Sequence, residues 1–199
     1  EADAIHPGYG FLSENADFAR AVEKAGLIFI GPTPLQIESM GDKVRARELM
    51  ESASVPVIPG TDGPIDDKKT LQKEAKRIGY PLLLKAAGGG GGKGIRRVDD
   101  KKDLESAWER TRSEALSAFG DGRVYIERFV SSARHIEAQI VGDGHGCVWF
   151  LGERECSLQR HHQKVLEESP SPVIDDETRS RLREAAIAGA ASINYRGAG

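Results

Sequence analysis

The chain has 199 residues, of which 39% are hydrophobic and 30% charged, and its formal net charge is −3 at pH 7. This length accommodates one or two packed domains, and the composition is typical of a globular protein. The small net charge gives no reason to expect nucleic acid or a membrane as partner. No apolar run approaches the roughly 20 residues of a membrane-spanning helix.

Cysteine usage argues against a disulfide framework. Cys147 and Cys156 are the two cysteines of the chain, and they lack metal-ligand spacing. We therefore expect a reducing compartment. The sequence shows no secretory leader. It begins with Glu1 rather than methionine and ends at Gly199 with no closing element expected, so we interpret it as a fragment of a longer protein.

Residues 1–31 have the pattern of the end of a βαβ unit. Ala4-Ile5 ends a strand, Ser13 is suited to cap a helix that runs to about Ala25, and Leu27–Ile30 predicts a short buried strand. The loop His6–Gly10 follows the carboxyl end of a strand, where ligands bind in open α/β sheets. This loop is either the edge of a site or an ordinary tight turn.

Two helices are predicted next. Thr33-Pro34-Leu35-Gln36 combines a capping threonine, a proline at the first helical position and a glutamine three residues after the cap. Asp42 is suited to cap the second helix, which runs to about Ala53 and carries Lys43 in its first turn. A cation there opposes the helix dipole. Lys43 therefore either serves a ligand or is simply solvated.

A glycine-rich stretch is the most distinctive part of the sequence. Residues 55–64 form a connection rich in proline and glycine, which predicts a domain boundary, and a helix from about Asp67 to Gly79 follows. An apolar run then ends in Lys85 and leads into glycines 88–92, Lys93 and Gly94. Glycine lacks a Cβ atom, so the N–H groups of such a loop can approach an anion closely.

Two familiar phosphate-binding motifs do not fit this stretch. A Walker A loop fails because Ala87 stands where its first glycine belongs and Gly94 follows Lys93 where Ser or Thr is needed. A dinucleotide-binding fingerprint must open a helix, whereas Ile95–Val98 is short and β-like. We therefore expect a strand–loop–strand hairpin that covers nucleotide phosphates, with a flexible linker as the alternative.

The second half of the chain predicts a helix and three strands. Asp100 is suited to cap a helix to about Phe119, and Val124–Val130 predicts a strand, so segment 65–130 is expected to form a small α+β unit. Residues 135–140 alternate between polar and apolar, and Cys147–Glu155 is expected to return as the paired strand. The polar half, which is His135, Glu137 and Gln139, either faces solvent or lines a site.

The segment Cys156–Lys164 is dense in hydrogen-bond donors and shows no helical stripe. The adjacent pair His161-His162 is a poor metal motif without suitably spaced partners. A cationic, donor-rich loop suits a nucleotide sugar or a small oxyanion better. A last helix is predicted to begin at Asp175 and to end near Ile193.

Taken together, these motifs resemble the biotin carboxylase family of ATP-grasp enzymes over essentially the whole chain. The matching stretches are residues 6–15, 40–43, 85–96, 134–137 and 159–164. The resemblance implies an α/β (α+β) fold, an ATP-grasp fold preceded by the C-terminal part of a Rossmann-like biotin carboxylase N-terminal domain. Residues 1–54 would end that domain, 55–130 would form the ATP-grasp lid subdomain, and 131–199 would begin the ATP-grasp C-terminal subdomain.

The resemblance also implies a ligase activity. ATP would phosphorylate bicarbonate to carboxyphosphate, and the carboxyl group would then pass to biotin on a carrier protein or domain. ATP, Mg2+ or Mn2+ and biotin would be required, together with a carboxyltransferase subunit or domain. The full-length protein would assemble into a homo-oligomer in the cytoplasm or the mitochondrial matrix. The alternatives are a non-catalytic nucleotide-binding module and another ATP-grasp ligase, such as a carbamoyl-phosphate synthetase.

Residue by residue, the resemblance assigns roles to most of the motifs and favours a ligand role for Lys43. Lys164 would be catalytic and would bind bicarbonate, and Tyr9 and Gly10 would line the biotin side of the cleft. The residues expected at ATP are Lys43, Lys85, Gly91, Gly92, Glu127, Arg128, Phe129, Val130, His135, Gln159 and His162. The metal-binding glutamates, the catalytic base and the biotin-site arginine would lie beyond Gly199, so we expect the 199-residue chain alone to be inactive.

The sequence departs from the family pattern at three positions. Arg128 replaces a common lysine and Ile95 a common methionine, and both changes look benign. His161 stands where the family usually has arginine. A histidine keeps the donor capacity but carries full charge only below roughly pH 6.5.

This departure yields a prediction about bicarbonate. The KM for bicarbonate should rise as the pH increases from about 6 to about 9, because His161 loses its positive charge over this range. Steady-state kinetics of the natural full-length protein at several pH values measures it. In a His161→Arg variant the rise should be smaller, and a KM that stays flat in the wild type would contradict the prediction.

Overall fold

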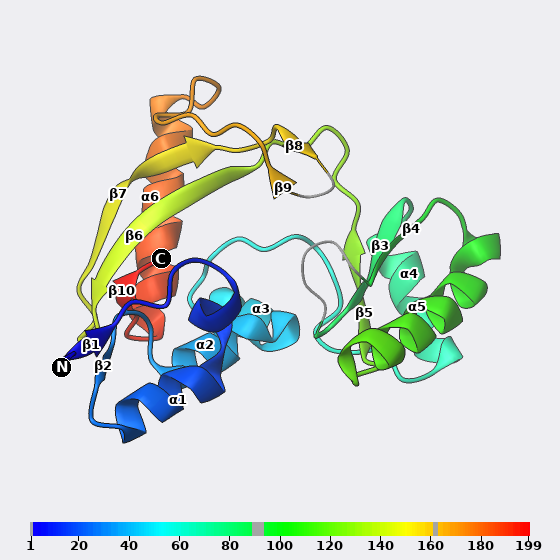
Figure 1. The fold of residues 1–199 in the computed structure, drawn as a ribbon. Coiled ribbons are helices and arrows are strands. Elements are labelled where there is room, and N and C mark those ends of the chain that lie inside the picture. The colour runs from blue at the N-terminus through cyan, green and yellow to red at the C-terminus, as the bar shows by residue number, and fades with distance from the viewer. Residues whose placement is uncertain (1, 89–93, 161–162) are drawn as a thin grey trace.

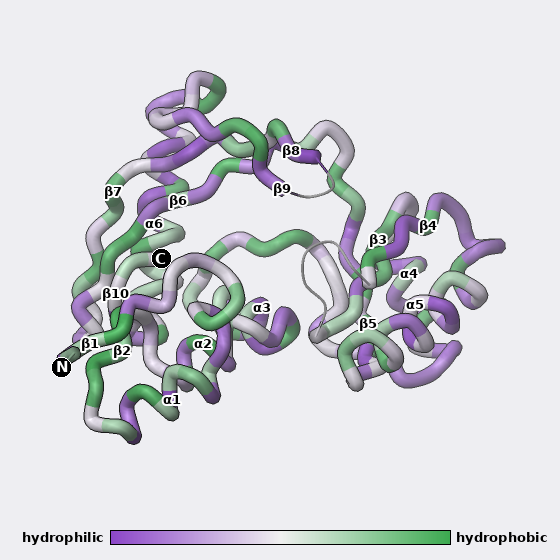
Figure 2. The backbone as a smooth tube through the Cα atoms, viewed as in Figure 1, coloured by the Kyte–Doolittle hydropathy of each residue, from purple (hydrophilic) through white to green (hydrophobic). Residues whose placement is uncertain are grey.

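The computed structural model describes residues 2–88, 94–160 and 163–199 (Figure 1). In Figure 1 the first and last segments of the chain lie side by side, and the segment from α4 to β5 forms a separate body. Figure 2 shows mainly hydrophobic residues in β1 and β2 and hydrophilic residues in β8 and β9. Among the described residues, no helix is long and apolar enough to cross a membrane.

The N-terminal segment contains the predicted βαβ end. Strands β1 (Ala4–Ile5) and β2 (Ile28–Phe29) pair in parallel, with η1 (Phe11–Glu14) and α1 (Ala16–Lys24) between them. β2 is buried only on the side of Phe29, because Ile28 is 64% exposed, so the prediction of a fully buried strand was wrong.

The predicted cap of α1 was also wrong. Asn15 caps the helix by accepting a hydrogen bond from the N–H of Phe18 at 2.8 Å. Ser13 lies in the preceding 3-10 turn, where its hydroxyl donates to the carbonyl oxygen of Gly10 at 2.9 Å. Both residue types are good caps. The hydroxyl of Ser13 is used inside the turn, so the α-helix begins only after it.

The two following helices confirm their predicted caps. α2 (Pro34–Gly41) begins with a complete capping box, in which Thr33 and Gln36 each accept from the other's backbone N–H. α3 (Lys43–Ser52) is capped by Asp42, whose carboxylate accepts from two backbone N–H groups. Lys43 is the first residue of α3, as predicted.

The middle of the chain forms the predicted α+β unit. Its elements are α4 (Lys68–Ile78), β3 (Leu82–Ala86), β4 (Ile95–Val98), η2 (Lys101–Asp103), α5 (Leu104–Phe119) and β5 (Val124–Arg128). The antiparallel sheet has the order β4-β3-β5, which confirms the hairpin across the glycine-rich stretch. Its core contains Leu71, Leu82, Leu84, Trp108 and Ile126.

A second antiparallel sheet carries the last third of the chain. Its order is β10-β6-β7, with β6 (Ile136–Asp143) and β7 (Val148–Glu155) forming the predicted hairpin. α6 (Asp176–Ser192) begins one residue after Asp175, where the sequence predicted its start, and Asp175 caps it. The short strands β8 (Gln159–Arg160) and β9 (Gln163–Lys164) form a small hairpin.

Strand β10 (Arg196–Ala198) corrects the expectation that no closing element follows α6. It pairs with β6, so that Gly197 lies opposite Gly142. A three-residue strand that contains glycine is too short to show the alternation of polar and apolar residues by which a strand is predicted. Its partner lies about fifty residues earlier in the chain, and only the folded sheet brings the two together.

This pairing predicts the effect of a glycine substitution. A Cβ on Gly142 would overlap the carbonyl oxygen of Tyr195 and lie 2.8 Å from its carbonyl carbon. Gly142→Ala should therefore lower the free energy of unfolding by about 1–3 kcal/mol, measured by urea denaturation. Gly63→Ala is the matched control, because a Cβ there meets nothing within 4 Å. Equal stability of the two variants would contradict the close packing of β10.

Candidate functional site

Two lysines and a glutamate form the first cluster. Lys85 lies on the face of β3 opposite to the core residues Leu82 and Leu84. Its Nζ lies 2.6 Å from Oε2 of Glu127 in β5, and the two side chains are only 18% and 13% exposed. Alternation along both strands explains this position, since Lys85 follows Leu84 and Glu127 follows Ile126, and these two core residues face the other way.

Lys43 adds a second positive charge near this ion pair. Burial, together with the nearby charge of Lys85, lowers the pKa of Lys43 from its ordinary value. Val44, Ala87 and Tyr125 form the small apolar cluster beside these charges. The ion pair of this cluster joins Glu127 to Lys85, and Lys43 adds a further positive charge that suits an anionic ligand such as a phosphate.

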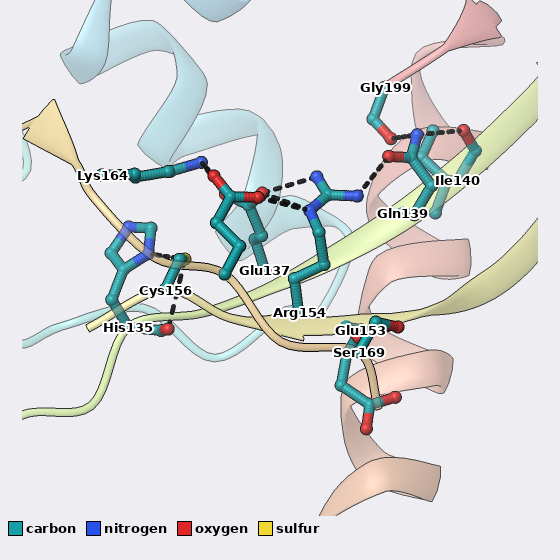
Figure 3. A network of polar contacts seen from close by, with 11 residues as sticks. His135, Glu137, Gln139, Ile140, Glu153, Arg154, Cys156, Lys164, Ser169 and Gly199 are labelled. Atoms are coloured by element: carbon teal, nitrogen blue, oxygen red, sulfur yellow. Dashed lines mark hydrogen bonds and ion pairs between the residues drawn. The ribbon is translucent and has the colours of Figure 1, made fainter. Parts of the chain in front are cut away.

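A second cluster centres on Glu137 (Figure 3). The carboxylate of Glu137 accepts a hydrogen bond from Nζ of Lys164 in β9, and its Oε1 accepts one from Nε of Arg154 at 2.7 Å. Arg154 also donates to Oε1 of Gln139 at 2.7 Å and lies 3.2 Å from a carboxylate oxygen of Glu167. The hairpin register produces the contact, because Glu137 lies opposite Arg154.

The two cations determine the ionisation of this cluster. Burial opposes the charged form of Glu137, but the hydrogen bonds from Lys164 and Arg154 outweigh it, and the pKa of the carboxyl lies below its ordinary value. The hydrogen bond to Glu137 in turn raises the pKa of Lys164. Both residues are therefore charged at neutral pH, and an anion that approaches Lys164 must compete with Glu137.

His135 and Gln159 lie beside this cluster. Nδ1 of His135 lies 2.6 Å from Sγ of Cys156, and the backbone N–H of His135 donates to Oγ of Ser157 at 2.7 Å. Nε2 of Gln159 donates to the carbonyl oxygen of Cys156 at 3.0 Å. Burial, followed by the charge of Glu137, raises the pKa of the Cys156 thiol.

The segment that follows Glu127 is fixed by backbone bonds. The N–H of Arg128 donates to the carbonyl oxygen of Pro59 at 2.8 Å, and the N–H of Phe129 donates to that of Pro81 at 3.1 Å. The guanidinium of Arg128 donates to the carbonyl oxygen of Ile78. Val130 is exposed. The β5 end of the sheet is thus tied to the 55–64 connection.

The loop after β1 opens onto a cleft of about 600 Å3. Tyr9 is 96% exposed, and Gly10 has a φ of 64°, a left-handed conformation that glycine adopts readily. The same cleft is lined by Gly88 and Gly197, which are distant in sequence. The loop that the sequence predicted as a possible site edge therefore does border a cavity.

The structure brings some predicted site residues together and leaves others outside what it describes. Lys43, Lys85 and Glu127 meet in one cluster, and His135, Gln159 and Lys164 surround another. Gly91, Gly92, His161 and His162 lie outside the described residues. Among the described residues, no hydrogen bond or ion pair joins the two clusters.

Sequence reasoning missed Arg154 and Cys156 as members of the second cluster. The only sequence signal for Arg154 was the predicted pairing of residues 135–141 with 147–155, whose register would place Arg154 opposite Glu137. That pairing includes a bulge between Gln139 and Ile140, which the sequence does not reveal. The spacing of the cysteines gave no indication that Cys156 approaches His135.

Two protein-family models match the chain and define the class of protein. Residues 42–199 match the model described as the carbamoyl-phosphate synthase L chain, ATP binding domain. Residues 1–37 match the biotin carboxylase N-terminal domain. The chain is therefore the end of a biotin carboxylase N-terminal domain followed by an ATP-grasp domain.

Full-length relatives narrow this class, and the chain belongs to the biotin carboxylase family. It is 50% identical over 199 residues to the biotin carboxylase of Pseudomonas aeruginosa, of which it covers 44%. It is 53% identical over 195 residues to a pyruvate carboxylase of Aspergillus terreus, covering 98% of this chain and 16% of that protein. The chain thus spans less than half the length of these relatives.

Solved structures agree with this assignment. A biotin carboxylase–βγ-ATP complex from Campylobacter jejuni matches with a TM-score of 0.94 and 52% identity, over 99% of this chain and 44% of that one. The biotin carboxylase domain dimer of a Hydrogenobacter thermophilus 2-oxoglutarate carboxylase matches with a TM-score of 0.92 and 46% identity, over the same shares. The second structure contains MgADP, ADP and bicarbonate.

The shared carboxylate of Glu137 predicts a pH-dependent contribution to stability. Its folded pKa lies below the unfolded value of about 4.3, so its contribution is present above that pH and is lost as the pH falls through the folded pKa. Glu137→Gln should lower the free energy of unfolding by about 1–3 kcal/mol at neutral pH. The difference from wild type should shrink in acid.

Urea denaturation at neutral and acidic pH measures this difference. Glu48→Gln in α3 is the matched control, because Glu48 is exposed and should contribute little at any pH. A difference that does not depend on pH would mean that Glu137 stabilises the fold through packing and not through its charge.

Proposed function

We propose that this chain belongs to the catalytic machinery of a biotin carboxylase, which uses ATP and bicarbonate to carboxylate biotin on a carrier protein through carboxyphosphate. The observation that carries the proposal is the pairing of Lys164 with Glu137 beside His135 and Gln159, in a chain that also holds the Lys43 and Lys85 cluster. Lys43 and Lys85 provide positive charge that can bind phosphate, and Lys164 provides positive charge that can bind a small oxyanion.

The first cluster would bind the nucleotide phosphates. Phosphoryl transfer depends mainly on positioning and charge neutralisation. Lys43 and Lys85 provide positive charge, and Lys85 would exchange its contact with Glu127 for a phosphate oxygen. Gly91 and Gly92 would complete the phosphate contacts through their backbone.

The segment from Glu127 to Val130 would contact the adenine. The N–H groups of Arg128 and Phe129 already donate within the chain, to Pro59 and Pro81. The carbonyl groups of this segment and the N–H of Val130 would therefore form the backbone contacts to adenine. His135, Gln159 and His162 would lie at the nucleotide on the opposite side.

The second cluster would bind bicarbonate. Lys164 is held by Glu137, and Arg154 holds the other side of the same carboxylate. When an anion binds Lys164 in place of Glu137, the carboxylate of Glu137 stays paired with Arg154 and its charge remains compensated. This sharing reduces the cost of moving Lys164 between Glu137 and the substrate.

Carboxyphosphate hydrolyses readily, so the reaction needs a site that excludes water. The hairpin of β3 and β4 would supply the lid. Tyr9 and Gly10 would line the biotin side. Tyr9 borders the cleft that is also lined by Gly88, beside the glycine-rich stretch. The cleft thus connects the biotin side with the base of the lid.

Mg2+ or Mn2+, when bound, would supply positive charge that neutralises the nucleotide phosphates. The described residues of the phosphate cluster do not fit a metal site of this kind, which needs carboxylate oxygens. Its carboxylate, Glu127, is paired with Lys85, and the other charged groups are lysines. No step of the mechanism is therefore routed through a metal bound by these residues, and the expectation of ligands beyond Gly199 stays a prediction.

The domain division and the partners follow from the same proposal. We assign residues 1–54 to the N-terminal domain, 55–130 to the lid and 131–199 to the C-terminal subdomain. Separate apolar cores within 5–37 and 65–126 support the first two units. The proposed partners are a biotin carrier, a carboxyltransferase and a second copy of the full-length protein, in the cytoplasm or the mitochondrial matrix.

A second candidate is a different ATP-grasp ligase of the carbamoyl-phosphate synthetase type. The match of residues 42–199 to the ATP-binding domain of that synthase favours it. The match of residues 1–37 to a biotin carboxylase domain favours the first proposal instead. A non-catalytic nucleotide-binding module is the remaining alternative, and activity measurements separate the three.

The decisive measurement is ATP hydrolysis by the natural full-length protein with free biotin, with and without bicarbonate. Bicarbonate should stimulate hydrolysis, and Lys164→Ala should remove the stimulation, while ATP binding persists because Lys43 and Lys85 are intact. Lys69→Ala, an exposed lysine of α4, is the matched control and should behave as wild type. Hydrolysis indifferent to bicarbonate would indicate another ligase, and binding without hydrolysis a non-catalytic module.

A further inference from the structure

Three potential metal ligands of different chemistry meet beside the candidate bicarbonate site. One ligand atom from each of His135, Glu137 and Cys156 lies within 4.8 Å of the others (Figure 3). His135 directly precedes β6, Glu137 lies within it, and Cys156 directly follows β7. The hairpin ladder continues between the outer two, because the N–H of Cys156 donates to the carbonyl oxygen of His135 at 2.9 Å.

The cluster has a buried side and an accessible side. Cys156 is fully buried, whereas His135 is exposed, so an ion can reach the thiol from the side of the imidazole. Nδ1 of His135 and Sγ of Cys156 lie 2.6 Å apart. Two such ligands of one tetrahedral zinc ion lie about 3.5 Å apart. A small rotation of the exposed imidazole therefore makes room for an ion.

The ligand types determine which metal would bind. A thiolate and an imidazole are preferred by borderline-soft divalent cations such as zinc, whereas magnesium prefers oxygen ligands. Three protein ligands also leave a fourth tetrahedral position for water or substrate. We propose that His135, Glu137 and Cys156 form a binding site for a thiophilic divalent cation, zinc or a metal of similar preference.

Binding at this site involves no redox step. The thiol of Cys156 loses its proton to water as the sulfur–metal bond forms, and His135 binds through its neutral Nδ1. Glu137 provides one carboxylate oxygen and can keep its other oxygen on Arg154. The metal takes the place of the thiol proton, so one proton is released for each ion bound.

The metal and Lys164 compete for the same carboxylate. Lys164 donates to one oxygen of Glu137, and a dication bound there replaces this contact and repels the ammonium. This consequence rests on the proposed function: a bound ion removes Lys164 from its place and weakens bicarbonate binding. The site would therefore make the enzyme sensitive to inhibition by zinc.

Cobalt(II) is a suitable probe, because thiolate coordination gives it an intense near-ultraviolet charge-transfer band. The natural full-length protein, without nucleotide, should develop this band with one equivalent of cobalt and lose it when zinc is added. Cys156→Ser should abolish the band and weaken zinc binding at least about 100-fold, as measured by competition with a chromophoric chelator. His135→Ala should weaken it as well.

Cys147→Ser is the matched control, since Cys147 is the exposed cysteine of the chain and should not contribute. Thermal unfolding of each variant establishes that it is folded, and the exposed His135 gives a variant that does not disturb the core. The proposed site would be overturned if the cobalt band survived in Cys156→Ser or disappeared in Cys147→Ser. It would also be overturned if His135→Ala bound zinc as tightly as the wild type.

Kinetics test the competition with Lys164 separately. Zinc should raise the KM for bicarbonate in wild type and in Cys147→Ser, and this effect should be absent from Cys156→Ser. If the protein binds cobalt but zinc does not change the KM for bicarbonate, the proposed competition with Lys164 is wrong and the proposed metal site still stands. Absence of bicarbonate-dependent hydrolysis would refute the proposed function, whereas the cobalt spectrum would still decide the metal site.

Discussion

Glu137 pairs with two cations at once, and the second half of the structure depends on this shared carboxylate. Arg154 reaches it across the β6–β7 hairpin, and Lys164 reaches it from the small β8–β9 hairpin. A single carboxylate between two cations retains a partner when one of them leaves. The contact therefore fixes the β8–β9 hairpin against the sheet and still leaves Lys164 available to an anionic ligand.

The same arrangement recurs in the first cluster. Lys85 is held by Glu127 inside the small sheet, with Lys43 nearby at the start of α3. In both clusters a lysine that would bind an anion is paired with a glutamate from another strand, which is the neighbouring strand β5 for Lys85 and a strand of a different sheet, β6, for Lys164. Pairing holds each lysine in a defined position, and at Lys164 the hydrogen bond to Glu137 raises the pKa against the effect of burial. The cost is a competition between the glutamate and the anionic substrate for the lysine.

The connection between α3 and α4 ties the middle unit of the chain to the segment that precedes it. Residues 55–64 have no helix or long strand, yet they are tied to β5: the N–H of Thr61 donates to Ile126, and the N–H of Arg128 donates to Pro59. These bonds fix the α4–β5 unit relative to the segment that follows α3. On the other side, Gln36 donates to the carbonyl oxygens of Ile193 and Asn194, which joins α2 to the end of α6.

The sequence by itself determined the elements whose ends depend on neighbouring residues: the capping box at Thr33, the cap at Asp42, the start of the last helix at Asp175, and the β3–β4 and β6–β7 hairpins. Family motifs further indicated Lys43, Lys85 and Lys164 as ligand-binding residues. Only the tertiary structure decided that β10 closes the second sheet, that Arg154 shares Glu137 with Lys164, and that Cys156 lies against His135. Caps and tight turns are local interactions that a short window of residues specifies, whereas these contacts join residues far apart in the chain and depend on strand register, including a bulge that no local pattern encodes.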